Sequence, residues 1–163
     1  MIGIDIGRVI ISGDTDIPNQ FFGEDYLKVP EVKGAFKTIE QIVEKYSSDK
    51  VYLVSKCGEI VQERTLEWLS YHDFFSKTGF NMDNIRFCRE RHEKKEICKE
   101  NNIRIFIDDR FSVLTHLKEL EQLYLFDPSE DELKLFTKVN DRQNIRLVKG
   151  WDEIQNGLIA KDK

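Results

Sequence analysis

Short apolar runs alternate along the chain with stretches in which apolar residues recur every three or four positions. The runs cover residues 2–6, 51–54, 85–88, 103–107, 123–126 and 145–148. Because they are apolar almost throughout, they predict strands buried on both faces, as in a parallel sheet with helices on each side.

Three of the intervening stretches place their apolar residues on one helical face. These faces consist of Phe36, Ile39, Ile42, Val43 and Tyr46; of Val61, Thr65, Trp68 and Leu69; and of Phe111, Leu114 and Leu117. Further helices are predicted over residues 93–101, over 129–137 with an initial serine and an acidic first turn, and over 151–159. The alternation predicts an α/β fold: a three-layer sandwich with a mainly parallel central sheet.

Residues 11–32 fit neither period, because they are rich in Gly, Asp, Asn and Phe. We expect an irregular loop or flap there, within a single domain that spans residues 1–163. Two roles are open for Phe21, Phe22 and Tyr26 in this segment: stacking on a ring of a ligand, or anchoring the loop to the core.

The composition excludes some classes of protein. The chain has 25 Lys and Arg against 30 Asp and Glu, a net charge of −5, which disfavours nucleic acid as a partner. No apolar run is long enough for a membrane helix, and the N-terminus lacks the order of regions of a signal peptide. Three cysteines do not make a disulfide framework. We therefore expect a soluble, cytoplasmic protein without a membrane partner.

Polar residues follow the predicted strands at their carboxyl ends. In an open α/β sheet these ends meet at the edge where ligands bind. Acids there can hold Mg²⁺, a hydroxyl and an ammonium can hold a phosphoryl group, and one carboxylate can attack phosphorus. The candidate residues are Asp5, Ser55, Lys56, Lys94 or Lys95, Asp108 and Asp109.

The order of these residues resembles the haloacid dehalogenase-like superfamily of phosphotransferases. The matching segments are Ile-Gly-Ile-Asp-Ile-Gly-Arg-Val-Ile at 2–10, Val-Tyr-Leu-Val-Ser at 51–55, Glu-Lys-Lys at 93–95 and Ile-Phe-Ile-Asp-Asp-Arg at 105–110. The resemblance implies a phosphatase-type member whose cap is absent or minimal, because too few residues separate the motifs for a cap domain. A response regulator would carry its lysine after the acidic pair, whereas here the lysine precedes it.

The resemblance also implies roles for the individual residues. Asp5 is the expected nucleophile, Ser55 the hydrogen-bond donor to the phosphoryl oxygens, and Lys94 the compensating cation, with Lys95 as the alternative. Mg²⁺ is the expected cofactor, and its expected ligands are Asp5, Asp109, the backbone carbonyl of Gly7 and, in support, Asp108. Lys56 and Arg8 are expected to bind substrate, although a surface ion pair is an equal alternative for Arg8.

The first motif departs from the family at Gly7, where most phosphatases of the family have a second aspartate that protonates the leaving group. Loss of a general acid costs about 10²–10⁴-fold in rate. The four matched motifs make a Mg²⁺-dependent phosphomonoester hydrolase that acts through an aspartyl-phosphate the leading hypothesis. The alternative is a weak or inactive binding or regulatory protein on the same fold.

The sequence leaves the substrate open, small molecule or macromolecule, as long as it is phosphorylated. An open site is also compatible with a homo-oligomer in which another subunit covers it.

Two other kinds of site, a zinc site and a cysteine phosphatase site, are disfavoured. The spacing of Cys88, His92 and Cys98 fits no standard zinc site, and Cys57 lacks the arginine six positions later that a cysteine phosphatase needs, because position 63 is Glu.

Overall fold

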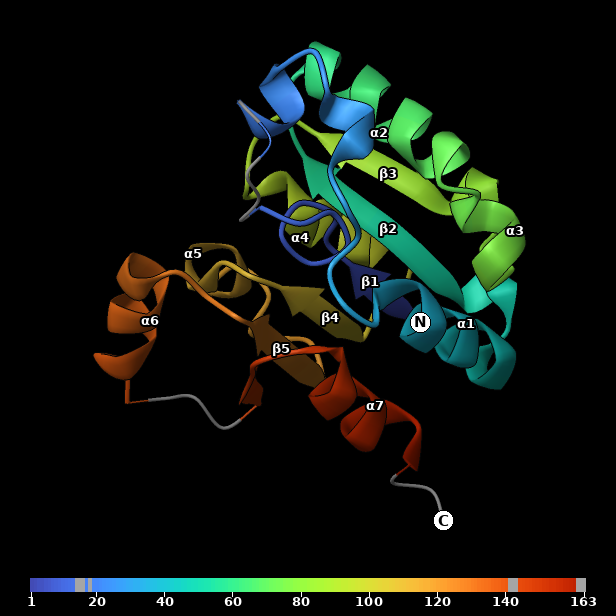
Figure 1. Cartoon of the computed structure of the whole chain (residues 1–163). Helices are drawn as coiled ribbons and strands as arrows, with labels where there is room; N and C mark the ends of the chain where they lie inside the picture. The colour runs from blue at the N-terminus through green and yellow to red at the C-terminus, as the bar shows by residue number, and fades with distance from the viewer. Residues whose placement is uncertain (14–16, 18, 141–143, 161–163) are drawn as a thin grey trace.

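The structure is a computed structural model, and it describes residues 1–13, 17, 19–140 and 144–160. Six parallel strands form one sheet in the order β3-β2-β1-β4-β5-β6 (Figure 1). The strands are β1 (Ile2–Ile4), β2 (Val51–Lys56), β3 (Ile85–Cys88), β4 (Ile105–Asp108), β5 (Gln122–Phe126) and β6 (Ile145–Val148). The strand order reverses between β1 and β4, which makes their carboxyl ends the expected ligand-binding position of this Rossmann-like sheet.

Helices cover both faces of the sheet. They are α1 (Ala35–Tyr46), α2 (Glu59–Tyr71), α3 (Phe74–Thr78), α4 (Glu93–Glu100), α5 (Phe111–Leu114), α6 (Glu130–Thr137) and α7 (Trp151–Leu158). One buried cluster joins α1, α2, α3 and α7 to the sheet, and a second joins α4, α5 and α6 to the sheet. The predicted α/β class, its parallel sheet and the lack of a separate cap domain are thereby confirmed for the described residues.

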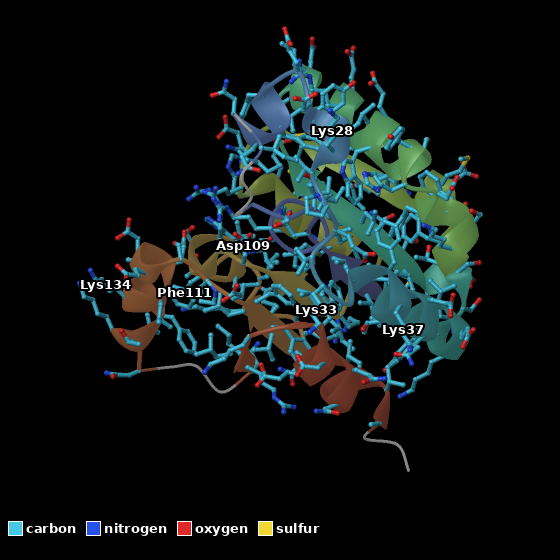
Figure 2. The ribbon with its side chains drawn as sticks, in the orientation of Figure 1. Lys28, Lys33, Lys37, Asp109, Phe111 and Lys134 are labelled. Carbon is cyan, nitrogen blue, oxygen red and sulfur yellow. The ribbon has the colours of Figure 1, made fainter. Side chains whose placement is uncertain are left out.

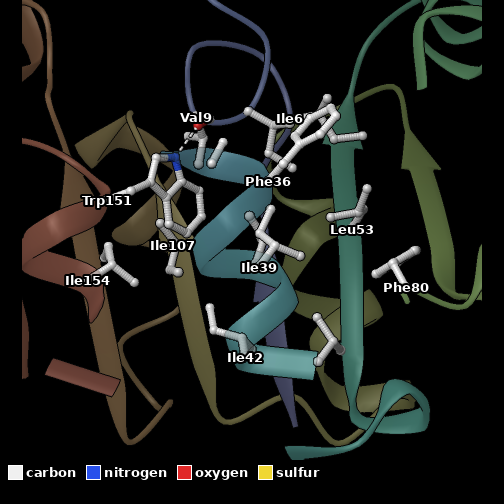
Figure 3. Close-up of a cluster of buried hydrophobic side chains, with 14 of the residues drawn as sticks. Ile6, Val9, Phe36, Ile39, Ile42, Leu53, Phe80, Ile107, Trp151 and Ile154 are labelled. Atoms are coloured by element: carbon white, nitrogen blue, oxygen red, sulfur yellow. Dashed lines mark hydrogen bonds between the residues drawn. The ribbon is translucent and has the colours of Figure 1, made fainter. Parts of the chain in front are cut away.

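The cluster around α1 also holds the loop that follows β1 (Figure 3). Phe36, Ile39 and Ile42 of α1 are buried there beside Trp151 of α7. The Trp151 indole Nε1 donates a hydrogen bond of 2.7 Å to the carbonyl of Val9. The backbone just beyond Asp5 is therefore fixed by two helices from distant parts of the chain.

Strands β1 and β4 approach each other closely at Gly3. A Cβ atom at Gly3 would lie 2.6 Å from the ring of Phe106 on β4. No larger residue fits without displacing that ring, so this position of β1 requires glycine.

The main differences from the sequence prediction concern boundaries. β1 ends at Ile4 rather than residue 6, β4 begins at Ile105 rather than 103, and α5 stops at Leu114. The pattern did not predict α3, which is only five residues long. Ser129 is the N-cap of α6, as expected, because its side chain accepts a hydrogen bond from the Glu132 backbone. Within the described residues, every helix is too short or too polar to cross a bilayer.

Candidate functional site

Three buried carboxylates meet where the strand order reverses. Asp5 directly follows β1, Asp108 ends β4, and Asp109 follows it at the same edge, where Figure 2 labels it. The Asp5 amide donates to the carbonyl of Ile107 at 2.9 Å, so the two strand ends stay in register up to the site. One side-chain oxygen from each of the three acids lies within 4.8 Å of the others.

Lys94, near the start of α4, lies against this acidic group. Its Nζ is 2.8 Å from Asp108 Oδ2 and 3.1 Å from Asp5 Oδ1, and only 2% of the lysine is exposed. Burial alone would lower the pKa of Lys94, but the carboxylates of Asp108 and Asp5 outweigh it and raise that pKa. Lys95 instead faces Glu119 at 3.7 Å on the surface, with half of its side chain exposed.

The three carboxylates carry more negative charge than Lys94 can balance. Burial, followed by the charges of Asp5 and Asp108, raises the pKa of Asp109 to about 9. Burial and the charge of Asp5 also raise the pKa of Asp108, although Lys94 and the Arg110 amide partly oppose this. A divalent cation would relieve this repulsion, and three carboxylates are oxygen ligands of the type that Mg²⁺ prefers. The donor set therefore fits a Mg²⁺ site.

All the residues predicted for the site border one cavity of about 1170 Å³. They are Asp5, Gly7, Arg8, Ser55, Lys56, Lys94, Asp108 and Asp109. Ser55 is buried at the end of β2, whereas Lys56 and Arg8 are exposed at the cavity rim. A Cβ atom at Gly7 would meet nothing within 4 Å, so the missing side chain leaves open space there rather than relieving a clash.

The cavity also has walls formed by residues that were not predicted as part of the site. Arg91 and Arg110 add positive charge, and Ile60, Val61 and Val113 add apolar surface. Arg91 lies three residues before Lys94 in a run of mixed charges, which is typical of a solvated segment. Arg110 directly follows the acidic pair, so its position at a strand end was the one signal that could have pointed to it.

A roof segment, defined as residues 19–32, lies beside α2 (Figure 1). Its residues 19–22 border the cavity. It contains two 3-10 turns, η1 (Gln20–Phe22) and η2 (Tyr26–Lys28). Arg64 of α2 donates to the carbonyls of Phe21 at 2.7 Å and Gly23 at 3.1 Å, and its guanidinium lies over the ring of Tyr26. The predicted flap also includes residues 14–16 and 18, which lie outside the described residues.

The aromatic residues of the roof divide between the two predicted roles. Phe21 packs edge-on against Tyr26, whose hydroxyl donates to Glu67 of α2, so both rings anchor the segment. Phe22 is 76% exposed and borders the cavity, which leaves its ring free to meet a ligand.

The cysteines form no competing site among the described residues. All three are free thiols, and burial raises the pKa of Cys57, partly offset by a hydrogen bond from Ser55. A thiol that stays protonated is a poor nucleophile. In the part of the chain that the structure describes, the cluster suited to a metal is that of the three aspartates and does not include Cys88, His92 or Cys98.

Comparison with known proteins adds evidence on the fold. The sequence matches no protein-family model and no curated protein. Among solved structures it is similar to one described as the structure of DsGPDH of Dunaliella salina, with a TM-score of 0.60 and 15% sequence identity. The match covers 96% of this chain but 28% of that one, so the similarity concerns a part of a longer protein and shows the fold alone.

Proposed function

We propose that the protein is a Mg²⁺-dependent phosphomonoester hydrolase of the haloacid dehalogenase-like type, acting through an aspartyl-phosphate on Asp5. The observation that carries this proposal is the group formed by Asp5, Asp108, Asp109 and Lys94, which opens into a large cavity at the switch point of the sheet. The match to a solved structure supports only the fold on which such a site is built.

The expected metal ligands are Asp5, Asp109 and the backbone carbonyl of Gly7, with Asp108 in support. When bound, Mg²⁺ neutralises negative charge on the phosphoryl oxygens. Lys94 holds Asp5 and Asp108 by direct contacts and adds a positive charge close to the reacting oxygen. The Ser55 hydroxyl lies at the end of the neighbouring strand, where it can donate to a phosphoryl oxygen.

In the first step, a carboxylate oxygen of Asp5 attacks phosphorus and the bond from phosphorus to the leaving oxygen breaks. With no acid at position 7, the leaving oxygen takes its proton from solvent water. A water molecule then attacks the aspartyl-phosphate and releases inorganic phosphate, which returns the Asp5 carboxylate. This scheme favours substrates whose leaving groups need little protonation.

The open space beside Gly7 supports a second candidate function, a binding or regulatory protein that holds a phosphorylated ligand without turning it over. The ligand in either case is a phosphorylated small molecule or macromolecule, and nucleic acid and membranes are not proposed as partners. A homo-oligomer that covers the cavity remains part of the proposal, as does a location in the cytoplasm.

Phosphate release from an activated aryl phosphate, measured with Mg²⁺ and with EDTA, separates the two candidates. We expect Mg²⁺-dependent turnover in the wild type and a loss of at least about 10³-fold in Asp5→Asn. Asp127→Asn is the matched control, because Asp127 is an exposed acid directly after β5 at the same sheet edge and does not border the cavity. Turnover that is equal in wild type and Asp5→Asn, both shown to be folded, would refute the hydrolase and leave the binding protein.

A further inference from the structure

Arg91 is a half-buried arginine on the wall of the cavity, three residues before Lys94. Among the described residues, no ion pair includes its guanidinium. Its Nη1 donates instead to a neutral acceptor, the hydroxyl oxygen of Ser112 on α5, at 3.0 Å. A guanidinium without a carboxylate partner at the edge of a cavity is suited to bind an anion.

The neighbouring carboxylate of Glu132 accepts two hydrogen bonds from Ser112. The Ser112 hydroxyl donates to Glu132 Oε1 at 2.7 Å, and the Ser112 amide donates to Glu132 Oε2 at 3.0 Å. The hydroxyl therefore lies between the acid and the guanidinium, and it holds Arg91 in place without a direct ion pair to Glu132. Because these contacts join the turn before α4 to α5 and α6, the fold fixes the position of Arg91, which is not a freely moving surface side chain.

Under the proposed function, the reacting phosphoryl group has its own partners in Lys94, Ser55 and the Mg²⁺ that the three aspartates would hold. The cavity of about 1170 Å³ is much larger than a phosphate alone requires. An additional fixed guanidinium in such a cavity suits a second oxyanion, for which the planar fork of arginine offers two parallel donors.

We propose that Arg91 binds a second anionic group on the substrate, so that the substrate is a phosphomonoester whose leaving group carries a carboxylate or another phosphate. This inference rests on the proposed function for the identity of the first phosphate. Ser112 acts as a positioning residue, since it touches Arg91 and does not itself border the cavity.

Binding of phosphonates, which cannot be hydrolysed, tests this proposal independently of turnover. Calorimetry in the presence of Mg²⁺ compares ω-carboxyalkylphosphonates of two to four methylenes with alkylphosphonates of equal length. We expect at least one carboxylate ligand to bind wild type tenfold or more tightly than its alkyl partner, as for a charged hydrogen-bonded pair. Arg91→Gln should lose this preference while binding the alkylphosphonates within about twofold of wild type.

Arg89→Gln is the matched control, because Arg89 lies in the same loop but donates to the Cys57 carbonyl and to Gln62 and does not border the cavity. It should keep the full preference, and Ser112→Ala should reduce it by about threefold, as expected for a residue that only positions another. A preference that survives in Arg91→Gln, or equal affinities in wild type for every pair, would overturn the proposal. If the phosphonate preference holds but turnover of phosphate esters is absent, the hydrolase fails and the second anion site stands.

Discussion

The acidic group with Lys94 and the roof segment border the same cavity, but different forces hold them. The acids and Lys94 are nearly fully buried, and Asp5 and Asp108 are placed by the backbone of two adjacent parallel strands. The roof is joined to α2 by side chains that bond to backbone carbonyls, as Arg64 does at Phe21 and Trp68 at Val29. The acidic group is therefore placed by strand pairing, whereas the roof depends on side-chain contacts with α2 and on Val29, which is buried in the core cluster of β1.

The largest difference in folding stability between changes to the acidic group and changes to the roof should appear when Lys94 is replaced. Lys94→Met leaves Asp5 and Asp108 buried without their cation, and breaking a buried ion pair in this way costs about 3–5 kcal/mol. Urea unfolding of the metal-free protein at neutral pH measures this loss. Lys95→Met, the neighbouring exposed lysine, should change the free energy of unfolding by less than about 0.5 kcal/mol. Equal effects of the two variants would contradict the proposed role of Lys94 in the core.

Mg²⁺ should stabilise the protein more at high pH than at low pH. The raised pKa values of Asp108, about 6, and Asp109, about 9, mean that the folded protein holds protons that the unfolded chain has released. The stability of the metal-free protein should thus fall as the pH rises from about 4, the ordinary carboxyl value, towards 9.

Mg²⁺ bound by these acids should offset this loss of stability, because it favours their ionised form. At a hundredfold excess over its dissociation constant, Mg²⁺ should add about 2.7 kcal/mol. Unfolding curves with Mg²⁺ or EDTA at about pH 5 and about pH 8 measure the effect. Asp109→Asn should abolish most of it and Asp127→Asn should not; a Mg²⁺ effect independent of pH would argue against binding at these acids.

Much of this chemical group could be predicted from the sequence, for a physical reason. Buried parallel strands are apolar, so their ends are visible as the points where polar residues begin, and parallel strands bring these points together. Asp5, Ser55 and Asp108 were found in that way. The choice between Lys94 and Lys95 depends on which of them lies on the buried face of α4. Cys98 is buried and lies four residues after Lys94, so it indicates that Lys94 is on that face.

The roof and Arg91 could not be predicted in the same way. The roof residues have no periodic pattern, and Arg64 binds them across more than forty positions of the chain. Among the described residues, Arg91 has no ion pair and bonds to Ser112, which in turn bonds to Glu132, so its surroundings come from two later helices. Such contacts arise from tertiary packing, which local sequence patterns do not contain.

A smaller effect, on turnover, is expected from a substitution at Gly7, which borders the same cavity and has open space where its side chain would lie. Gly7→Asp restores the aspartate of the first motif, and no neighbouring atom stands within 4 Å of its Cβ. Turnover of an unactivated alkyl phosphate should rise by about tenfold, less than the roughly 10²–10⁴-fold of an evolved general acid because no neighbouring residue positions the new carboxyl, while turnover of the activated aryl phosphate changes little. Gly58→Asp, which adds the same charge to the same cavity at another open position, should not reproduce this selectivity. An equal effect on both esters would mean that proton donation is not what Gly7 lacks.

The smallest effect should come from loosening the roof at Arg64. Arg64→Met removes two hydrogen bonds to backbone carbonyls and the contact with the Tyr26 ring, at a cost of about 1 kcal/mol. The bonds from Trp68 to Val29 and between His72 and Leu27 remain, so the segment should stay on α2 while it is cleaved faster in limited proteolysis. Arg89→Met, which also loses a bond to a backbone carbonyl but not one to the roof, should leave the cleavage rate unchanged. Because the roof does not hold the acids, turnover of a small activated phosphate should change by less than about threefold. A loss of turnover as large as that expected for Asp5→Asn would show that the two regions act as one unit.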